Sequence, residues 1–223
     1  LHPHDPYLAL RPFWDMYDHD AIDMPAVPRQ DDAAGRRMYQ LYDRGEIPLS
    51  AEQIRRARHA YYGMISYCDA LLGRLIDTLK ALGQFDNTIV VVTSDHGDML
   101  GAHGGMHQKW HNAYEESIHV PFIISNPLLF PQAVSSERLT SHIDLLPTLL
   151  SIAKADVSTL QQSLRKTHDI VRPPVGRDLS ALFRGETREE STPQEEECVY
   201  FMTDDQVSDG GSWLEFGALK LPY

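Results

Sequence analysis

The sequence has no long hydrophobic run, very few cysteines and few basic residues for its acidic content. No apolar run approaches the roughly 20 residues that a helix needs to cross a bilayer. Two cysteines, Cys68 and Cys198, are too few for a disulfide framework. The 20 Lys and Arg against 32 Asp and Glu give a formal net charge of −12, which argues against nucleic acid or an anionic membrane as partner. These absences predict a soluble globular protein, with the cytoplasm and the periplasm both open.

The two ends of the chain also lack the features of a complete protein. The chain begins LHPHDPYLAL, with no Met and no signal-peptide pattern, and it ends EFGALKLPY. We therefore expect a piece of a larger protein, whose remaining part holds further residues of any active site.

A long helix that starts after Ser50 is the clearest predicted element. Gln53 follows three residues later, which is a capping-box pattern, and Gly83 is the expected stop. The preceding residues 1–50 are rich in Pro, Asp and aromatics and predict a long loop. Apolar residues of the helix recur at three- and four-residue steps: Ile54, Tyr61, Ile65, Cys68, Leu72, Leu75 and Leu79.

Two apolar runs after this helix predict strands. Residues 88–94 (TIVVVTS) and 120–125 (VPFIIS) show almost no polar alternation, which is typical of strands buried on both faces of a parallel sheet. Residues 142–153 predict a helix with Asp144 as N-cap and Pro147 in its first turn. Residues 176–185 predict a short helix, and residues 198–203 predict a last strand. This order indicates an α/β sandwich with a mostly parallel sheet flanked by helices.

A cluster of chemically active residues follows the first predicted strand. Asp95 and His96 come directly after it, where ligands collect in open α/β sheets, and a carboxylate beside an imidazole suits half of a metal site. Glycines allow the loop to turn tightly, and His103, His107, Lys109 and His111 lie within it. Taken alone, the Asp-His pair is more typical of a turn than of a metal site. Taken alone, His103 or His107 is more typical of a surface or bracing histidine, and Lys109 of a solvated lysine. Their concentration favours a site on a loop.

Several stretches together resemble the sulfatase family of the alkaline phosphatase superfamily. The signature stretch is TSDHGDMLGAHGG, followed by Lys109 and YEESIHVPFIISNP. HPHDPY resembles the family's Pro-His-x-Pro loop, and YYGMISYCDALLGRLIDTLKALG resembles the helix before the signature strand. SHIDLLPTLLSIA and GRDLSALFRGE resemble the segment after it. The opening and the helix are most similar to choline-sulfatase-like and phosphonate-monoester-hydrolase-like branches.

The resemblance implies a domain assignment and an alkaline-phosphatase-like fold. Residues 1–185 match the C-terminal part of the catalytic domain, with the sheet incomplete at its N-terminal side. Residues 186–223 begin with the acidic segment ETREESTPQEEE and are expected to form a loop and the start of a small C-terminal subdomain.

The resemblance also implies roles for four residues. Asp95 and His96 match ligands of the active-site divalent metal. Lys109 matches the lysine that contacts the oxygens of the sulfate or phosphonate group, and His4 matches the histidine that faces the leaving-group oxygen. These roles suit the reaction, because a cation and an ammonium stabilise the ester's oxygens and a histidine can protonate the departing alcohol. His2 is the alternative to His4.

The spacing around Lys109 departs from the family pattern. Lys109 lies fourteen residues after Asp95, and Tyr114 lies five residues after Lys109, each one more than the pattern leads us to expect. His107 and His111 are therefore the alternatives to Lys109.

The family's nucleophile motif is a larger departure. Sulfatases make a formylglycine from Cys or Ser in a C/S-x-P/A-x-R motif, but Cys68 is followed by DALLG and Cys198 by VYFMT. The first pair of metal carboxylates is also absent. We therefore expect the formylglycine and the remaining metal ligands outside this chain, in an N-terminal segment of the same domain. The implied metal is Ca²⁺, with Mn²⁺ as the alternative because imidazole suits transition metals.

Three functions follow in order of preference. The first is metal-dependent hydrolysis of a small-molecule sulfate ester. The second is hydrolysis of phosphonate or phosphate esters on the same fold. The third, of another class, is a non-catalytic binding or scaffold domain. The sequence leaves the alcohol part of the substrate and the oligomeric state open, although the loop over residues 15–37 is expected to shape the alcohol pocket, with a surface excursion as the alternative.

Overall fold

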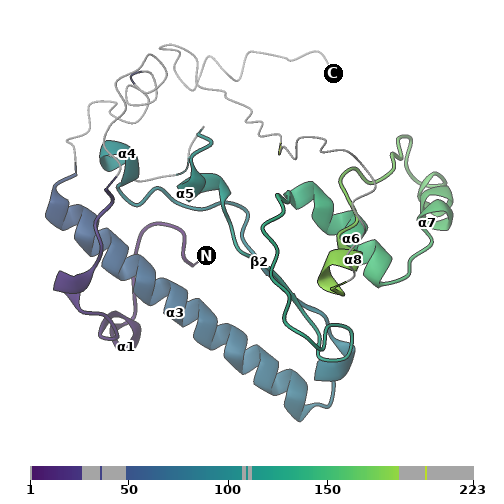
Figure 1. The fold of residues 1–223 in the computed structure, drawn as a ribbon, viewed down its shortest axis with the longest axis horizontal. Helices are drawn as coiled ribbons and strands as arrows, with labels where there is room; N and C mark the ends of the chain where they lie inside the picture. Colours follow the sequence, from purple (N-terminus) through teal and green to yellow (C-terminus); the bar gives the residue numbers. More distant parts are fainter. Residues whose placement is uncertain are drawn as a thin grey trace.

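The structure, a computed structural model, describes residues 2–26, 49–106 and 112–185, together with the single positions 36, 109 and 199. In this part of the chain, a long diagonal helix lies beside a two-stranded ribbon, and a small group of helices follows the ribbon (Figure 1). No helix among these residues is both long and apolar enough to cross a membrane. The acidic loop and the subdomain predicted for residues 186–223 lie outside the described residues, apart from Val199, and so does the predicted strand at 198–203.

The long helix α3 confirms the sequence prediction. It spans Ala51–Ala81, the Ser50 hydroxyl accepts from the Gln53 amide at 3.3 Å, and the Gln53 side chain accepts from the Ser50 amide at 2.8 Å. These two bonds satisfy groups that a helix start otherwise leaves without partners. The chain turns away at Gly83, where φ is +64°.

The buried face of α3 differs from the predicted apolar stripe. Ile65 is 44% exposed and Leu75 is 56% exposed, and Cys68 is only half-buried. The buried residues are His59, Ala60, Gly63 and Met64. This face is buried because the N-terminal segment packs against it. The segment includes α1 (Arg11–Trp14) and η1 (His19–Ala21). A Cβ on Gly63 would stand 2.8 Å from that of Ala9, so glycine permits the close approach.

The two strands pair differently from the prediction. After η2 (Phe85–Asn87), β1 (Val90–Thr93) pairs antiparallel with β2 (Phe122–Ser125), in a register that sets Val90 opposite Ser125. Parallel pairing and burial on both faces were expected, but Ile123 is 54% exposed. Continuous apolar runs therefore identified the strands but did not give their direction. Between them lie α4 (Ala102–Gly105) and α5 (Glu115–Ile118), which pack around buried Met99 and Met106.

The final helices are η3 (His142–Asp144), α6 (Leu145–Ile152), α7 (Val157–Leu164) and α8 (Ser180–Phe183). Of these, η3, α6 and α8 pack together near a buried carboxylate, and the Phe183 ring of α8 contacts the Phe122 ring of β2 at 5.5 Å between centroids. Asp144 is not the side-chain cap of α6 that the sequence predicted. Its carboxylate instead accepts from the amides of Ser141 at 3.0 Å and Arg177 at 2.7 Å, and from the Arg177 guanidinium at 2.9 Å. It therefore joins η3 to the loop before α8.

Candidate active site

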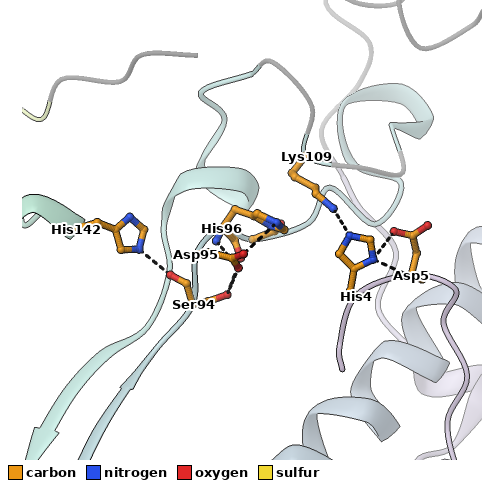
Figure 2. A network of polar contacts seen from close by, with 8 residues as sticks. His4, Asp5, Ser94, Asp95, His96, Lys109 and His142 are labelled. Carbon is orange, nitrogen blue, oxygen red and sulfur yellow. Dashed lines mark hydrogen bonds and ion pairs between the residues drawn. The ribbon is translucent and has the colours of Figure 1, made fainter. Parts of the chain in front are cut away.

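Asp95 and His96 lie in a tight turn directly after β1. The Ser94 hydroxyl donates to the carbonyl of His96 at 2.7 Å, and the amide of His96 donates to Oδ1 of Asp95 at 3.0 Å. These local bonds turn the chain sharply. Consecutive side chains of a strand point to opposite faces, but here the side chains of Asp95 and His96 both lie at the end of β1 (Figure 2). The Asp95 side chain is 87% exposed and that of His96 is 37% exposed.

The donor atoms of this pair suit a metal ion. The Gly97 carbonyl, 2.8 Å from Nδ1 of His96, can only accept, so it places the ring proton on Nδ1. Nε2 then offers its lone pair 3.7 Å from Oδ2 of Asp95. Two donors bonded to one ion at about 2.0–2.6 Å lie within roughly 5 Å of each other. A carbonyl that holds the second ring nitrogen is also the usual support of a metal-binding histidine.

No third possible ligand joins this pair among the described residues. Among residues 2–26, 49–106 and 112–185, no group of three or more His, Cys, Asp or Glu is placed to hold a metal ion. Asp95 nevertheless stays ionised readily. What burial it has opposes ionisation, but the neighbouring His96 ring, whenever it is protonated, and hydrogen bonds from the His96 amide and from Ser94 outweigh this effect and lower the pKa of Asp95.

The glycine-rich loop after this pair is held against α5. The Gly97 amide donates to the carbonyl of Ser117 at 2.7 Å, and a Cβ on Gly97 would stand 1.9 Å from the carbonyl oxygen of Glu116. Further along, Nε2 of His103 lies 3.2 Å from a carboxylate oxygen of Glu116, and the His103 ring stacks on Tyr114 at 3.7 Å between centroids. His103, which the sequence left open between a site residue and a brace, therefore braces the loop.

Lys109 and His4 meet although they are 105 positions apart in the sequence. Nζ of Lys109 donates to Nε2 of His4 at 2.8 Å (Figure 2). The His4 ring stands edge-on to that of His96, with centroids 6.4 Å apart. The structure thus brings the four residues singled out from the sequence to one place, while their roles stay predictions. His2, the alternative to His4, packs against the Tyr67 ring of α3, and His107 and His111 lie outside the described residues.

Two half-buried groups close behind the site were not predicted from the sequence. Burial raises the pKa of the Asp98 carboxyl, against the opposing effects of a hydrogen bond from Tyr7, the Leu100 amide and the charge of Lys109. Burial, together with Asp98, raises the pKa of the Tyr7 hydroxyl. Because Tyr7 follows His4 by three residues and Asp98 follows His96 by two, this pair helps to join the two segments. The aspartate in DHGD and the tyrosine in HPHDPY were visible, but their pairing across the fold was not.

His142 is a further residue that only the structure reveals. It belongs to η3, and its Nε2 donates to the carbonyl of Ser94 at 2.7 Å (Figure 2). The carbonyl just after β1 thereby gains a partner, so η3 supports the turn that carries Asp95 and His96. No spacing in the sequence connects position 142 with position 94.

Residues 18–23, part of the loop expected to shape the alcohol pocket, are fixed to α3. Arg55 donates to the carbonyls of Asp20 and Ile22 at 3.1 and 3.0 Å. Arg58 pairs with the Asp23 carboxylate and donates to the Asp23 carbonyl at 2.7 Å. Its Nη1 lies 3.4 Å from the carbonyl of Leu100, so one side chain joins this segment to the glycine-rich loop. Residues 27–35 and 37–48 lie outside the described part.

Comparison with known proteins shows which family the chain resembles. Residues 1–155 match a family model described as Sulfatase. The chain is similar to a choline-sulfatase of Rhizobium meliloti (strain 1021), with 38% identity over 68% of the chain and 30% of the relative. It is also similar to the multifunctional alkaline phosphatase superfamily protein PehA of Trinickia caryophylli, with 34% identity over 66% of the chain and 32% of the relative.

A solved structure supports the same fold. It is the phosphonate monoester hydrolase of Silicibacter pomeroyi, which matches 84% of the chain and 37% of its own length, with a TM-score of 0.65 and 29% identity. The chain thus spans about a third of the length of these proteins. The match confirms the predicted α/β fold of the alkaline phosphatase type, of which the chain forms a part.

Proposed function

Since the chain belongs to the sulfatase family, we propose that its residues form part of the active site of a metal-dependent sulfate-ester hydrolase. The observation that carries the proposal is the meeting of Lys109, His4 and the Asp95–His96 pair, with 2.8 Å between Lys109 and His4 and 6.4 Å between the rings of His4 and His96. A terminal anionic group and a leaving oxygen need a cationic site and a proton donor side by side, and these residues provide both.

Sulfatases generally use a divalent metal ion and a formylglycine nucleophile. The donor set present here fits two ligands of such an ion, Asp95 and Nε2 of His96. A bound cation would supply positive charge to the oxygens of the ester group. Ca²⁺ suits the carboxylate and Mn²⁺ suits the imidazole, so both ions are candidates for this site. The formylglycine is assigned to a segment outside these 223 residues.

Lys109 and His4 have separate tasks in the proposed reaction. The Lys109 ammonium binds an oxygen of the sulfate group, where negative charge shifts as the bond to the alcohol breaks. His4 is placed to hold a proton for the departing alcohol oxygen. A small-molecule sulfate ester is the proposed substrate.

A phosphonate or phosphate ester is the second candidate substrate. It is favoured by the similarity to a phosphonate monoester hydrolase at a TM-score of 0.65 and to a relative named as multifunctional. The two ester classes present similar anionic oxygens to Lys109 and the metal. A ratio of turnover rates on aryl sulfate and aryl phosphonate substrates separates them.

The decisive experiment uses the protein expressed from its full reading frame. We expect Asp95→Ala to abolish hydrolysis of 4-nitrophenyl sulfate and to lower metal content, because a charged ligand is lost. His96→Ala should do both less severely. The matched control is Asp77→Ala, which removes an exposed carboxylate of α3. Full metal occupancy in both site variants would remove the ligand assignment. A wild type that binds metal but turns over neither ester class would favour the non-catalytic alternative.

A further inference from the structure

His4 has a second neighbour besides Lys109, on its other ring nitrogen. Nδ1 of His4 lies 2.8 Å from the carbonyl oxygen of Asp5 and 2.9 Å from its carboxylate Oδ1 (Figure 2). The backbone carbonyl can only accept, so Nδ1 carries the ring proton and donates it to that carbonyl, with the carboxylate close beside the same nitrogen. The Asp5 side chain is 32% exposed, which leaves its charge partly shielded from water and close to the ring.

This arrangement determines what Nε2 of His4 can do. With one proton on Nδ1, a neutral ring has its lone pair on Nε2, and Nζ of Lys109 donates to that lone pair at 2.8 Å. Nε2 therefore holds no proton of its own in this state. A proton destined for an alcohol oxygen therefore has to arrive at Nε2 first.

We propose that Asp5 is the positioning residue of His4, which keeps Nε2 directed at Lys109 and balances the charge of the ring when Nε2 takes up a proton. The proposal rests on the proposed function, because the proton is meant for a departing alcohol. Asp5 touches neither substrate nor metal in this role. It acts through His4, as a carboxylate behind a histidine does in other hydrolytic sites.

The proton balance is closed. His4 takes one proton from water at Nε2, so the ring becomes positive while it faces the Asp5 carboxylate, and Lys109 keeps its ammonium for the sulfate oxygens. When the S–O bond breaks, the sulfur passes to the attacking nucleophile, and the alcohol oxygen keeps the electron pair and takes the Nε2 proton. His4 then returns to its neutral form with the proton still on Nδ1.

Asp5→Asn separates the charge from the geometry. The variant keeps the backbone carbonyl that accepts from Nδ1 and a side chain of the same size, but it removes the negative charge beside the ring. Asp5→Glu keeps the charge on a longer side chain and tests rescue. Asp15→Asn is the matched control, because Asp15 is exposed and lies in the same segment, outside the cluster.

The first measurement is spectroscopic and needs no turnover. In the full-length protein with ¹⁵N-labelled histidine, the His4 signal is assigned by its loss in His4→Gln. We expect a proton on Nδ1 and a bare Nε2 in the wild type. A neutral ring with the proton on Nε2 would overturn the proposal even if the enzyme hydrolyses sulfate esters.

The second measurement is kinetic. For Asp5→Asn we expect kcat on an alkyl sulfate, whose leaving group is poor, to fall about 10- to 100-fold. On 4-nitrophenyl sulfate, kcat should fall by less than about threefold, because a good leaving group needs little protonation. The Kd of inorganic sulfate should stay equal or fall, since a nearby negative charge is lost. Asp5→Glu should recover part of the alkyl sulfate rate, and Asp15→Asn should match the wild type.

The failures of the two proposals are distinguishable. A wild type that hydrolyses none of these esters refutes the proposed function. An active wild type whose Asp5→Asn variant loses the same factor on both substrates, or loses nothing on either, refutes the role of Asp5 and leaves the function standing.

Discussion

Replacement of Asp144 by Asn should destabilise the protein although its size hardly changes. The Asp144 side chain is 2% exposed, and its carboxylate accepts three hydrogen bonds: from the Ser141 amide, the Arg177 amide and the Arg177 guanidinium. An asparagine oxygen can keep the bonds made by one carboxylate oxygen, but its NH₂ group then faces the donors of the other. One or two charged hydrogen bonds are lost in either orientation.

The free energy of this loss can be approximated from the contacts. Hydrogen bonds to a charged group contribute about 1.5–3 kcal/mol each. Breaking a fully buried ion pair costs about 3–5 kcal/mol. Because Arg177 is 43% exposed, its charge stays partly hydrated and the lower end applies. We expect Asp144→Asn to reduce the free energy of unfolding by about 3 kcal/mol.

The assay is urea unfolding of the full-length protein at several pH values. The hydrogen bonds and the charge of Arg177 lower the pKa of Asp144 despite its burial, so its contribution is complete above the unfolded pKa of about 3.9 and is lost as pH falls towards the folded pKa. The difference between wild type and Asp144→Asn should therefore narrow below about pH 4.

Asp156→Asn is the control for this experiment. Asp156 accepts from the amides of Ser158 and Thr159 at the start of α7 but is exposed, and Asn is itself a good helix cap, so the loss should be much smaller. An Asp144→Asn variant with an unchanged urea midpoint at neutral pH would refute the reasoning. So would a difference from wild type that stays constant down to strong acid.

Three further outcomes are expected. Lys109→Ala should lower kcat on 4-nitrophenyl sulfate by about 10²–10³-fold, the usual effect of losing one donor to a developing charge. A change confined to KM would show that Lys109 binds the substrate and the transition state equally strongly. Gly97→Ala should abolish activity and cost stability, because its Cβ would stand 1.9 Å from the carbonyl oxygen of Glu116; a fully active variant, measured with the same ester, would mean that the loop does not need this contact. Arg58→Met should loosen Asp23 from α3 and raise hydrogen exchange in residues 18–23, and unchanged exchange there would show that Arg55 and the bond from the Tyr62 hydroxyl to Asp23 suffice to hold the segment.

The long helix was predictable because its signals are local. Ser50 and Gln53 are three residues apart, so the cap forms within one turn and requires no other part of the fold. The buried face was not predictable in the same way. Periodicity marks the apolar residues, but the segment with Trp14 decides which side is covered, and the Trp14 ring stacks on His59 at 3.7 Å.

The strands show where the sequence signal stops. The runs at 88–94 and 120–125 gave the position of β1 and β2 but not their antiparallel pairing, because pairing joins residues about 30 positions apart. Asp144 shows a similar limit. Its place before an apolar run is typical of an N-cap, yet its carboxylate accepts a hydrogen bond from Arg177, 33 residues later, instead.

The sequence by itself determined the chemical groups of the candidate site and the order in which they occur. Asp95 and His96 at a strand end, Lys109 in a glycine-rich loop and His4 in HPHDPY are local patterns that a reader can find without a structure. Only the tertiary structure decided that Lys109 donates to His4, that Asp5 lies on the other ring nitrogen and that His142 supports Ser94. The physical reason is that a hydrogen bond depends on distances of about 3 Å between atoms, and distances between remote segments are set by packing, which no local pattern encodes.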